Sequence, residues 1–353
     1  MKPTPNFSGI GAVREAHRFD EVALARWMDA NVAGYTGPLS VEQFQGGQSN
    51  PTYRLVTPTR SYVMRRKPPG KLLKGAHAIE REAQVLIALA KADFPVAEVY
   101  GLCTDEDVIG TCFYVMELVV GRTFWTASCE ELQPADRTAA FDAMNATIAR
   151  LHSVDHEAIG LSDYGRPGSY FERQISRWSR QYLEDPLAGR DPAMDRLIDW
   201  LPSHIPDVPE RTSIIHGDFR VDNMIYHSTS PRILAVLDWE LSTVGDPLAD
   251  FAYHLMMYRM PQLTIPGLAG LDLAALGIPS EADYVASYCS RTGRSGIPNL
   301  EFYLAFNFFR FAAIIHGIKG RLARGTATSP HARSLVDDLT TISALGWDIA
   351  QAN

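Results

Sequence analysis

The apolar positions in the first third of the chain follow two spacings that alternate along the sequence. Apolar residues at every second position indicate strands, and apolar residues three or four apart indicate helices. Asp20 would cap the first helix at its N-terminus. The predicted elements are a leading helix at 19–32, strands at 41–44, 52–56 and 61–66, a helix at 76–92, a short extended segment at 96–102 and a long apolar segment at 111–120.

From residue 134 onwards the pattern turns mostly helical, beginning with a predicted helix at 135–152. The segment 302–318 is apolar and aromatic, but Asn307, Arg310 and His316 interrupt it. A helix that spans a membrane needs about 20 apolar residues with few charges, so we expect a buried helix here. Arg310 is expected either to form a buried structural ion pair or to reach a substrate carboxylate.

The most informative polar residues follow two apolar segments in the second half of the chain. Ile214-Ile215 leads into His216-Gly217-Asp218, and Asn223 stands five residues after Asp218. Asp238 ends the predicted strand 233–237, and a Ser/Thr/Pro turn lies between the two segments. An Asp that orients an attacking hydroxyl, with an Asn and a second Asp that hold Mg²⁺, is the minimal set for phosphoryl transfer. This spacing predicts a kinase-type catalytic loop.

The first third of the chain supplies residues suited to bind the phosphates. A glycine-rich turn between two strands can bring backbone N–H groups close to phosphates. A strand over 61–66 places Arg65 and Lys67 on one face, with Glu82 of the next helix as partner and Glu80 near it. We expect one of these two cations to bind phosphate and Arg66 to face solvent. The glycine-rich turn contains Gly46, Gly47, Ser49 and Asn50.

Composition narrows the class of protein. A chain of 353 residues exceeds what one core usually supports, so two domains are expected. The net charge of −8 disfavours nucleic-acid binding. The four cysteines include no CxxC pair, and no signal peptide is evident, which is typical of a cytoplasmic protein.

Taken together, these motifs resemble those of the aminoglycoside phosphotransferase and choline kinase-like superfamily. The resemblance covers nearly the whole chain, and its most specific stretch is Gly245-Asp246-Pro247-Leu248-Ala249-Asp250. Three further stretches resemble the kinase-like domains found beside acyl-CoA dehydrogenases, which suggests a functional link to such an enzyme. These stretches are Gly46-Gly47-Gln48-Ser49-Asn50-Pro51-Thr52, Arg65-Arg66-Lys67-Pro68-Pro69-Gly70 and Arg173-Gln174-Ile175-Ser176-Arg177-Trp178.

The resemblance implies an α+β, bilobal protein-kinase-like fold. Residues 1–118 would form a small β-rich nucleotide-binding lobe, and residues 119–353 a larger, mostly helical catalytic and substrate lobe. Asp218 would be the catalytic base, and Asn223 and Asp238 would bind the Mg²⁺ of ATP. Arg65 stands where the family usually has Lys, a departure that keeps Lys67 as an alternative cation. By the same resemblance Glu82 would pair with the cation, Asp246 and Asp250 would be structural, and the adenine would be held by the backbone of Met116, Glu117 and Leu118.

The acceptor is expected to be a small molecule with a hydroxyl group. Gly217 stands where regulated protein kinases commonly have Arg, and only seven residues separate Asp238 from Asp246, too few for a long activation loop. Residues 319–333 contain four cations and no carboxylate. We therefore expect a neutral or anionic acceptor, such as a hydroxy acid or its coenzyme A thioester, although these cations would equally suit a solvated surface.

Two other functions remain open. An aminoglycoside or choline-type phosphotransferase would need acidic or aromatic walls around a cationic substrate. A catalytically silent nucleotide-binding regulatory module would typically lack the base or a metal ligand, whereas Asp218, Asn223 and Asp238 are all present. Of the other polar and aromatic residues, we expect His152 and His216 to act as hydrogen-bonding framework residues, and Trp178 and Tyr182 to pack in the core.

Overall fold

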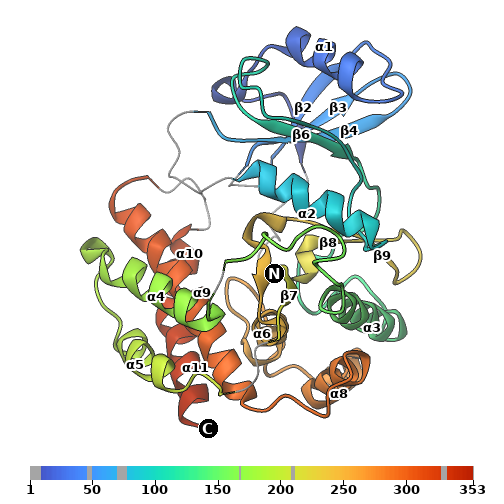
Figure 1. Cartoon of the computed structure of the whole chain (residues 1–353). Helices are drawn as coiled ribbons and strands as arrows, with labels where there is room; N and C mark the ends of the chain where they lie inside the picture. The colour runs from blue at the N-terminus through green and yellow to red at the C-terminus, as the bar shows by residue number, and fades with distance from the viewer. Residues whose placement is uncertain are drawn as a thin grey trace. The chain divides into compact units, whose positions relative to one another are not determined.

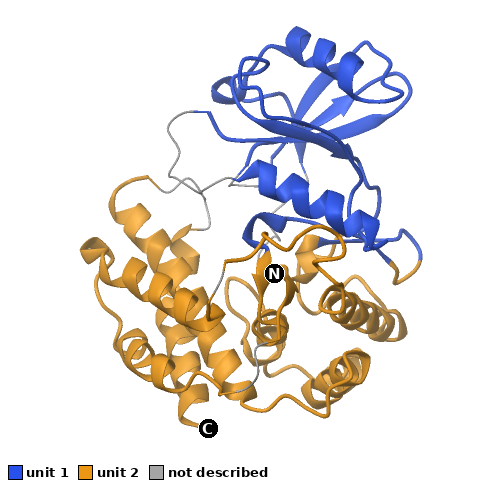
Figure 2. Ribbon diagram, viewed as in Figure 1, with its two compact units in different colours: residues 1–122, 224–229, 233–242 blue, residues 123–223, 230–232, 243–353 orange. Residues whose placement is uncertain are grey.

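The computed structural model describes residues 9–45, 50–69, 78–166, 168–207, 211–326 and 332–352. The chain folds into two compact units (Figures 1 and 2). Unit 1 contains residues 1–122, 224–229 and 233–242, and unit 2 contains the remainder. Asp238 therefore belongs to unit 1, and Asp218 and Asn223 belong to unit 2. The predicted lobe boundary after residue 118 stays a prediction.

Unit 1 is built on a six-stranded antiparallel sheet with strand order β1-β2-β3-β4-β6-β5. Its predicted strands and helices are present, with ends that differ by a few residues, and Asp20 caps α1 as expected. A separate hairpin of β8 and β9 completes the unit. The bounds are β1 Ile10–Gly11, α1 Glu21–Asn31, β2 Ser40–Phe44, β3 Thr52–Val56, β4 Ser61–Arg66, α2 Ile79–Lys91, β5 Val99–Cys103, β6 Phe113–Glu117, β8 Met224–Tyr226 and β9 Ile233–Val236.

Helices cover both faces of this sheet. Leu24 and Met28 of α1 pack in one buried cluster with Tyr53, Met64 and Phe113 of the strands. On the opposite face α2 packs against β5 and β6, as the ribbon shows (Figure 1). Side chains that alternate along β4 are therefore buried on whichever face they point to.

Unit 2 is mostly helical, and its longest helix, α9, lies at the centre of one bundle, in contact with α4, α6 and α11. β7 and β10 form a short antiparallel pair, and residues 216–223, the candidate catalytic segment, directly follow β7. The bounds are α3 Pro134–Leu151, α4 Tyr170–Leu183, α5 Pro192–Trp200, β7 Ser213–Ile215, β10 Thr243–Gly245, α6 Pro247–Arg259, α7 Leu273–Leu276, α8 Glu281–Arg291, α9 Leu300–Ala323, α10 Ala332–Asp337 and α11 Leu339–Gln351.

These elements confirm the predicted α+β class, with a β-rich N-terminal region and a helical C-terminal region. The apolar segment near residue 310 is α9, a helix buried along most of its length, as expected. Among the described helices, none combines the length and the unbroken apolar stretch required to cross a bilayer. Trp178 and Tyr182 are buried, as predicted.

Candidate active site

The segment after β7 carries the predicted base and is held in place through its backbone. Gly217 has a φ of +81°, a left-handed conformation that glycine adopts at little cost. The N–H groups of His216 and Gly217 donate to the two carboxylate oxygens of Asp250, at 2.8 and 2.7 Å. The N–H of Asp218 donates to Nδ1 of His216 at 3.1 Å. Asp250 therefore fixes the turn that presents Asp218.

The carboxylate of Asp218 has a donor on each oxygen. The Tyr253 hydroxyl donates to Oδ1 at 2.5 Å, and Nδ2 of Asn223 donates to Oδ2 at 3.1 Å. Burial works to raise the pKa of Asp218, but the Arg220 guanidinium and the Tyr253 hydrogen bond outweigh it and hold this pKa below its ordinary value. Asp218 is therefore ionised and fixed in orientation at neutral pH.

Asn223 has an amide oxygen that suits a hard cation. Its Nδ2 donates to both the backbone oxygen and Oδ2 of Asp218, at 2.9 and 3.1 Å, so Oδ1 is the amide atom that can act as a ligand. Among the described residues no cluster of three or more His, Cys, Asp or Glu side chains could hold a metal by itself. Mg²⁺ usually takes one or two protein oxygens and completes its coordination with phosphate and water, so Asn223 fits such an ion.

The other predicted ligand, Asp238, lies in unit 1 just after β9. Its φ of +64° places it in the left-handed region, which is uncommon for residues other than glycine and is often found at functional sites. Its side chain remains 38% exposed. Oδ1 accepts from both terminal nitrogens of Arg65, at 3.3 and 3.2 Å. A carboxylate that is partly exposed in this way can act as a metal ligand.

Arg65 pairs with Glu82, the carboxylate expected from the sequence. Its Nη1 lies 2.6 Å from Oε1 of Glu82, and the two side chains are only 12% and 2% exposed. Burial alone would lower the pKa of Arg65, but the charges of Glu82 and Asp238 raise it above its usual value. Lys67 pairs with Glu80 in a more exposed position. Each candidate cation thus has its own carboxylate on α2.

The expectation that Arg66 faces solvent was wrong, and so was the buried ion pair expected for Arg310. The other role expected for Arg310, contact with a substrate carboxylate, stays a prediction. Arg66 does not face solvent: it is 2% exposed, and its guanidinium lies over the rings of Phe19 and Tyr53, because α1 covers that face of the sheet. Arg310 forms no ion pair with any described carboxylate. Its Nη2 donates to the backbone oxygen of Gly217 at 2.6 Å.

The remaining nucleotide-site candidates that the structure describes lie at or next to the ends of β3 and β6 in unit 1. Gly46, Gly47 and Ser49 fall outside the described residues, and Asn50 is buried just before β3. Along the predicted hinge, Met116 is buried at the end of β6, the N–H of Glu117 donates to the oxygen of Glu98 at 2.8 Å, and Leu118 follows the strand.

The predicted framework residues connect the helices of unit 2 to the catalytic segment. His152 contacts the Tyr288 hydroxyl through Nδ1 at 2.8 Å and Asp250 through Nε2 at 3.2 Å. Asp246 caps α6 by accepting from the N–H groups of Leu248 and Ala249. These contacts agree with the framework and capping roles expected of His152, His216, Asp246 and Asp250.

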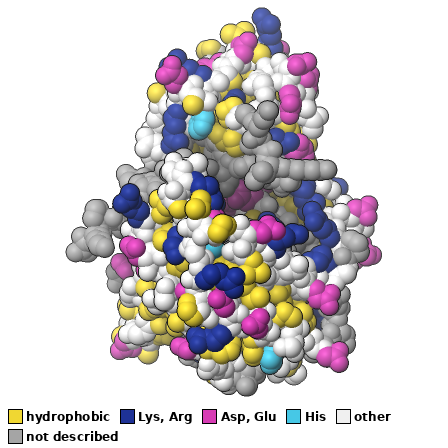
Figure 3. All heavy atoms as spheres, turned by 90° about the vertical axis from the view of Figure 1, so that its left-hand side faces the viewer, with side chains coloured by type: hydrophobic (Ala, Val, Ile, Leu, Met, Phe, Trp, Pro, Cys, Tyr) yellow, Lys and Arg dark blue, Asp and Glu magenta, His cyan; other side chains and the backbone are white. Residues whose placement is uncertain are grey.

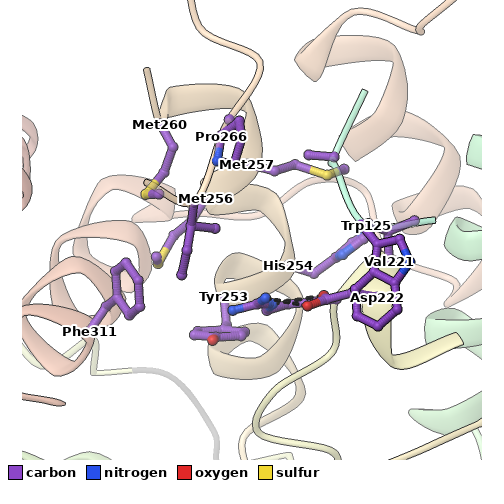
Figure 4. A pocket seen from close by; sticks show the side chains of 14 residues that line it. Trp125, Val221, Asp222, Tyr253, His254, Met256, Met257, Met260, Pro266 and Phe311 are labelled. Carbon is purple, nitrogen blue, oxygen red and sulfur yellow. Dashed lines mark hydrogen bonds and ion pairs between the residues drawn. The ribbon is translucent and has the colours of Figure 1, made fainter. Parts of the chain in front are cut away.

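A pocket in unit 2 lies beside the catalytic segment, with Tyr253 in its wall (Figure 4). It encloses about 590 Å³ of space between atoms, including its open mouth. Met256, Met260 and Phe311 lie on one side, and Trp125 and Val221 lie on the other (Figure 4). The wall contains one carboxylate, Asp222, and it forms an ion pair with Arg220. The pocket is therefore apolar and carries no unpaired acidic group.

Tyr253 and the methionines were not anticipated from the sequence, although one signal was present. Asp250 and Tyr253 are three residues apart in a helical pattern, which places them on the same face, and that face points to the catalytic segment. The methionines carried no such signal, because Met in a helix is most often part of a core.

Comparison with known proteins supports the predicted resemblance. Residues 40–284 match the phosphotransferase enzyme family (APH). The chain is 43% identical over 342 residues to mouse acyl-CoA dehydrogenase family member 10, covering 96% of this chain and 32% of that protein. It is 42% identical to the probable acyl-CoA dehydrogenase IBR3 of Arabidopsis thaliana, covering 98% and 44%. The chain thus spans less than half the length of these relatives.

Solved structures support the same fold. A putative aminoglycoside phosphotransferase from Ralstonia eutropha is 52% identical, with a TM-score of 0.88 over 95% of this chain and 99% of that one. Choline kinase from Cryptosporidium parvum is 12% identical with a TM-score of 0.62, covering 91% and 97%, and shares the fold. An aminoglycoside phosphotransferase solved with AMP-PNP and hygromycin B has a TM-score of 0.60 at 16% identity, covering 94% and 98%.

Proposed function

Because this chain belongs to the phosphotransferase enzyme family and is a small-molecule kinase, we propose that it transfers the γ-phosphoryl group of ATP to a neutral or anionic hydroxyl compound in a Mg²⁺-dependent reaction. The observation that carries the proposal is the environment of Asp218. Its ionised carboxylate is fixed by Tyr253 and Asn223, and Tyr253 also lines an apolar pocket.

In the proposed reaction the acceptor hydroxyl oxygen forms a bond to the γ-phosphorus of ATP. The bond between this phosphorus and the bridging oxygen breaks, and ADP leaves. Asp218 orients the hydroxyl and accepts its proton on a carboxylate oxygen; each oxygen can accept this proton as well as its existing hydrogen bond. An ionised base of low pKa suffices, because little proton transfer is needed before a loose phosphoryl-transfer transition state.

We propose a set of nucleotide-binding residues, most of which belong to unit 1. Asn223 and Asp238 would hold Mg²⁺, which neutralises charge on the phosphates when it is bound. Arg65 or Lys67 would bind a phosphate, with Glu82 keeping Arg65 in place. Gly46, Gly47, Ser49 and Asn50 would supply contacts to the phosphates, and the backbone of 116–118 would hold the adenine.

The acceptor pocket supports a substrate without multiple positive charges. A polycationic aminoglycoside requires acidic walls, whereas Asp222, the only acidic side chain among the described residues that line the pocket, is already paired with Arg220. On the face shown in Figure 3, cationic and acidic side chains are interspersed. Arg324, one of the four cations of 319–333, pairs with Asp185 at 2.9 Å, as expected of a solvated surface. The apolar pocket is therefore a stronger argument about the charge of the acceptor than these cations are.

The names of the relatives suggest a chemical class for the acceptor. Two of them are named acyl-CoA dehydrogenases, so we propose a hydroxylated carboxylic acid or its coenzyme A thioester as acceptor, and a functional link to an acyl-CoA dehydrogenase.

An acceptor screen tests the proposal. ADP release from Mg-ATP would be measured with hydroxy acids, their coenzyme A thioesters, choline and kanamycin, with Asp218→Asn and EDTA as controls. We expect turnover on a hydroxy acid or thioester that both controls abolish. Turnover on kanamycin alone would support an aminoglycoside phosphotransferase instead. Mg²⁺-dependent ATP binding without turnover on any acceptor would support a silent regulatory module.

A further inference from the structure

Two buried side chains from different helices of unit 2 converge on the segment that carries Asp218. Tyr253 belongs to α6 and is 7% exposed, and Arg310 belongs to α9 and is 6% exposed. Tyr253 reaches the carboxylate itself, where its hydroxyl lies 2.5 Å from Oδ1 of Asp218. A hydrogen bond from a hydroxyl to a carboxylate at this distance is of the strong, charge-assisted kind.

Arg310 acts on the backbone and on the tyrosine at once. Its Nη2 donates to the oxygen of Gly217 at 2.6 Å, and its guanidinium carbon lies 5.1 Å from the centre of the Tyr253 ring. A guanidinium at this distance from an aromatic ring is attracted to its face. Arg310 therefore fixes both the left-handed Gly217 and the ring whose hydroxyl holds Asp218.

The carboxylate group of Asp218 is consequently restrained against rotation. Tyr253 holds Oδ1 and Asn223 holds Oδ2, at 2.5 and 3.1 Å. Terminal carboxylate torsions are otherwise broad and weakly restrained. Since a base must present a lone pair towards the hydroxyl of the acceptor, this restraint has a direct use in the reaction.

We propose that Tyr253 is a positioning residue for the base Asp218, and that Arg310 supports it by fixing the Tyr253 ring and the Gly217 carbonyl. This inference rests on the proposed role of Asp218. Both residues are proposed to act through Asp218 and its loop rather than on the phosphates of ATP. Their contribution is to hold the carboxylate in the orientation that aligns the attacking hydroxyl.

The chain offers a matched control for Tyr253 on the same helix. Tyr258 is also buried, at 6% exposure, and its hydroxyl has no hydrogen-bond partner among the described residues. Replacing either tyrosine with Phe removes one hydroxyl and leaves the ring. Only Tyr253→Phe removes a contact to Asp218, so a general effect of losing a buried hydroxyl would appear in both variants.

The test uses Mg-ATP with water as the acceptor, measured as ADP release by the full chain. We expect Tyr253→Phe to lower kcat about 10- to 100-fold, because misalignment at a reacting centre has effects of this size. The KM for ATP should stay at the wild-type value, and the Tm should fall only modestly, because the buried carboxylate loses one of its two donors. Tyr258→Phe should keep the wild-type kcat. Arg310→Met should also lower kcat, Arg310→Lys should recover part of it, and the Tyr253→Phe/Arg310→Met double variant should lose less than the product of the single losses.

A wild-type kcat for Tyr253→Phe, or an equal loss in Tyr258→Phe, would overturn the inference. So would a change confined to the KM for ATP. A crystal structure of Tyr253→Phe gives a measurement independent of turnover: we expect the Asp218 carboxylate to rotate or to occupy more than one orientation, and an unchanged carboxylate would overturn the inference. Full activity of Asp218→Asn would instead refute the proposed base, so the two failures are distinguishable.

Discussion

The charged group of unit 1 and the catalytic segment of unit 2 are held in different ways. In unit 1, Arg65 is held between Glu82 and Asp238 by opposite charges. In unit 2, the carboxylate of Asp218 is held by a hydroxyl and an amide, and the backbone beside it by Asp250. Both groups are hydrogen-bonded, but the bonds of Arg65 also join opposite charges, whereas the donors to Asp218 are neutral groups that fix its direction. The difference fits the proposed reaction, in which unit 1 would accept a polyanion and unit 2 would align a hydroxyl.

The largest expected effect follows from removing the base. Asp218→Asn keeps the shape of the side chain but cannot accept the proton, so kcat should fall about a thousandfold. Its Tm should fall modestly, because the amide oxygen can still accept from Tyr253 but the amide nitrogen cannot accept from Nδ2 of Asn223. Steady-state kinetics and a thermal melt would check both parts. A variant with more than about a tenth of the wild-type kcat would contradict the role of Asp218.

In unit 1 the largest effect should be on stability. Arg65→Met leaves Glu82 buried without its counter-charge, and breaking a buried pair in this way costs about 3–5 kcal/mol. Urea unfolding would measure the loss, and Arg65→Lys, which keeps the charge, should lose less. A loss below about 1 kcal/mol would show that the pair is not needed to compensate Glu82.

Protonation of His254, a buried residue of unit 2, should lower the free energy of unfolding in acid. Its Nδ1 bonds to the oxygen of Phe219 and its Nε2 to the Tyr284 hydroxyl, and burial lowers its pKa to about 4. In the unfolded state His254 takes up a proton near pH 6.5, but in the folded state it does so only near pH 4. The contribution of neutral His254 to the free energy of unfolding is therefore fully present above pH 6.5 and is lost as the pH falls towards 4. The expected contribution is about 3 kcal/mol. Urea unfolding between pH 7 and 4 should show a smaller decrease in His254→Gln; an equal decrease would count against this.

The smallest effect should come from the exposed ion pair in unit 1. Lys67 and Glu80 are 21% and 40% exposed, so solvent screens their interaction. Lys67→Met should change the unfolding free energy by less than about 1 kcal/mol. A loss as large as that of Arg65→Met would remove the distinction between the two cations.

Much of the fold could be predicted because local periodicity sets it. The strands β3 and β4 and the helix α1 with its Asp20 cap follow from apolar spacing and one capping residue. The burial of Arg66 could not be predicted, since it depends on α1 covering a second face of the sheet. A period-two pattern shows which residues share a face but not whether that face is covered.

Prediction of the candidate site from the sequence is limited in the same way, because distant elements contribute residues to it. The proximity of Asp218 and Asn223 could be predicted because Asn223 stands five positions after Asp218 in one continuous loop. Tyr253 is 35 residues from Asp218 in sequence, and Arg310 is 93 residues from Gly217. Only the packing of α6 and α9 against the segment brings them to it, and the local pattern shows no more than that Tyr253 shares a helix face with Asp250.

Calorimetric titration of Mg-AMP-PNP into Asp218→Asn and Asp238→Asn tests the central claim most directly. If Asp218 aligns the acceptor and Asp238 helps to hold the metal–nucleotide complex, Asp218→Asn should bind within about twofold of wild type, and Asp238→Asn should bind more than about tenfold more weakly. Normal binding by Asp238→Asn, together with lost binding by Asp218→Asn, would contradict this division of roles.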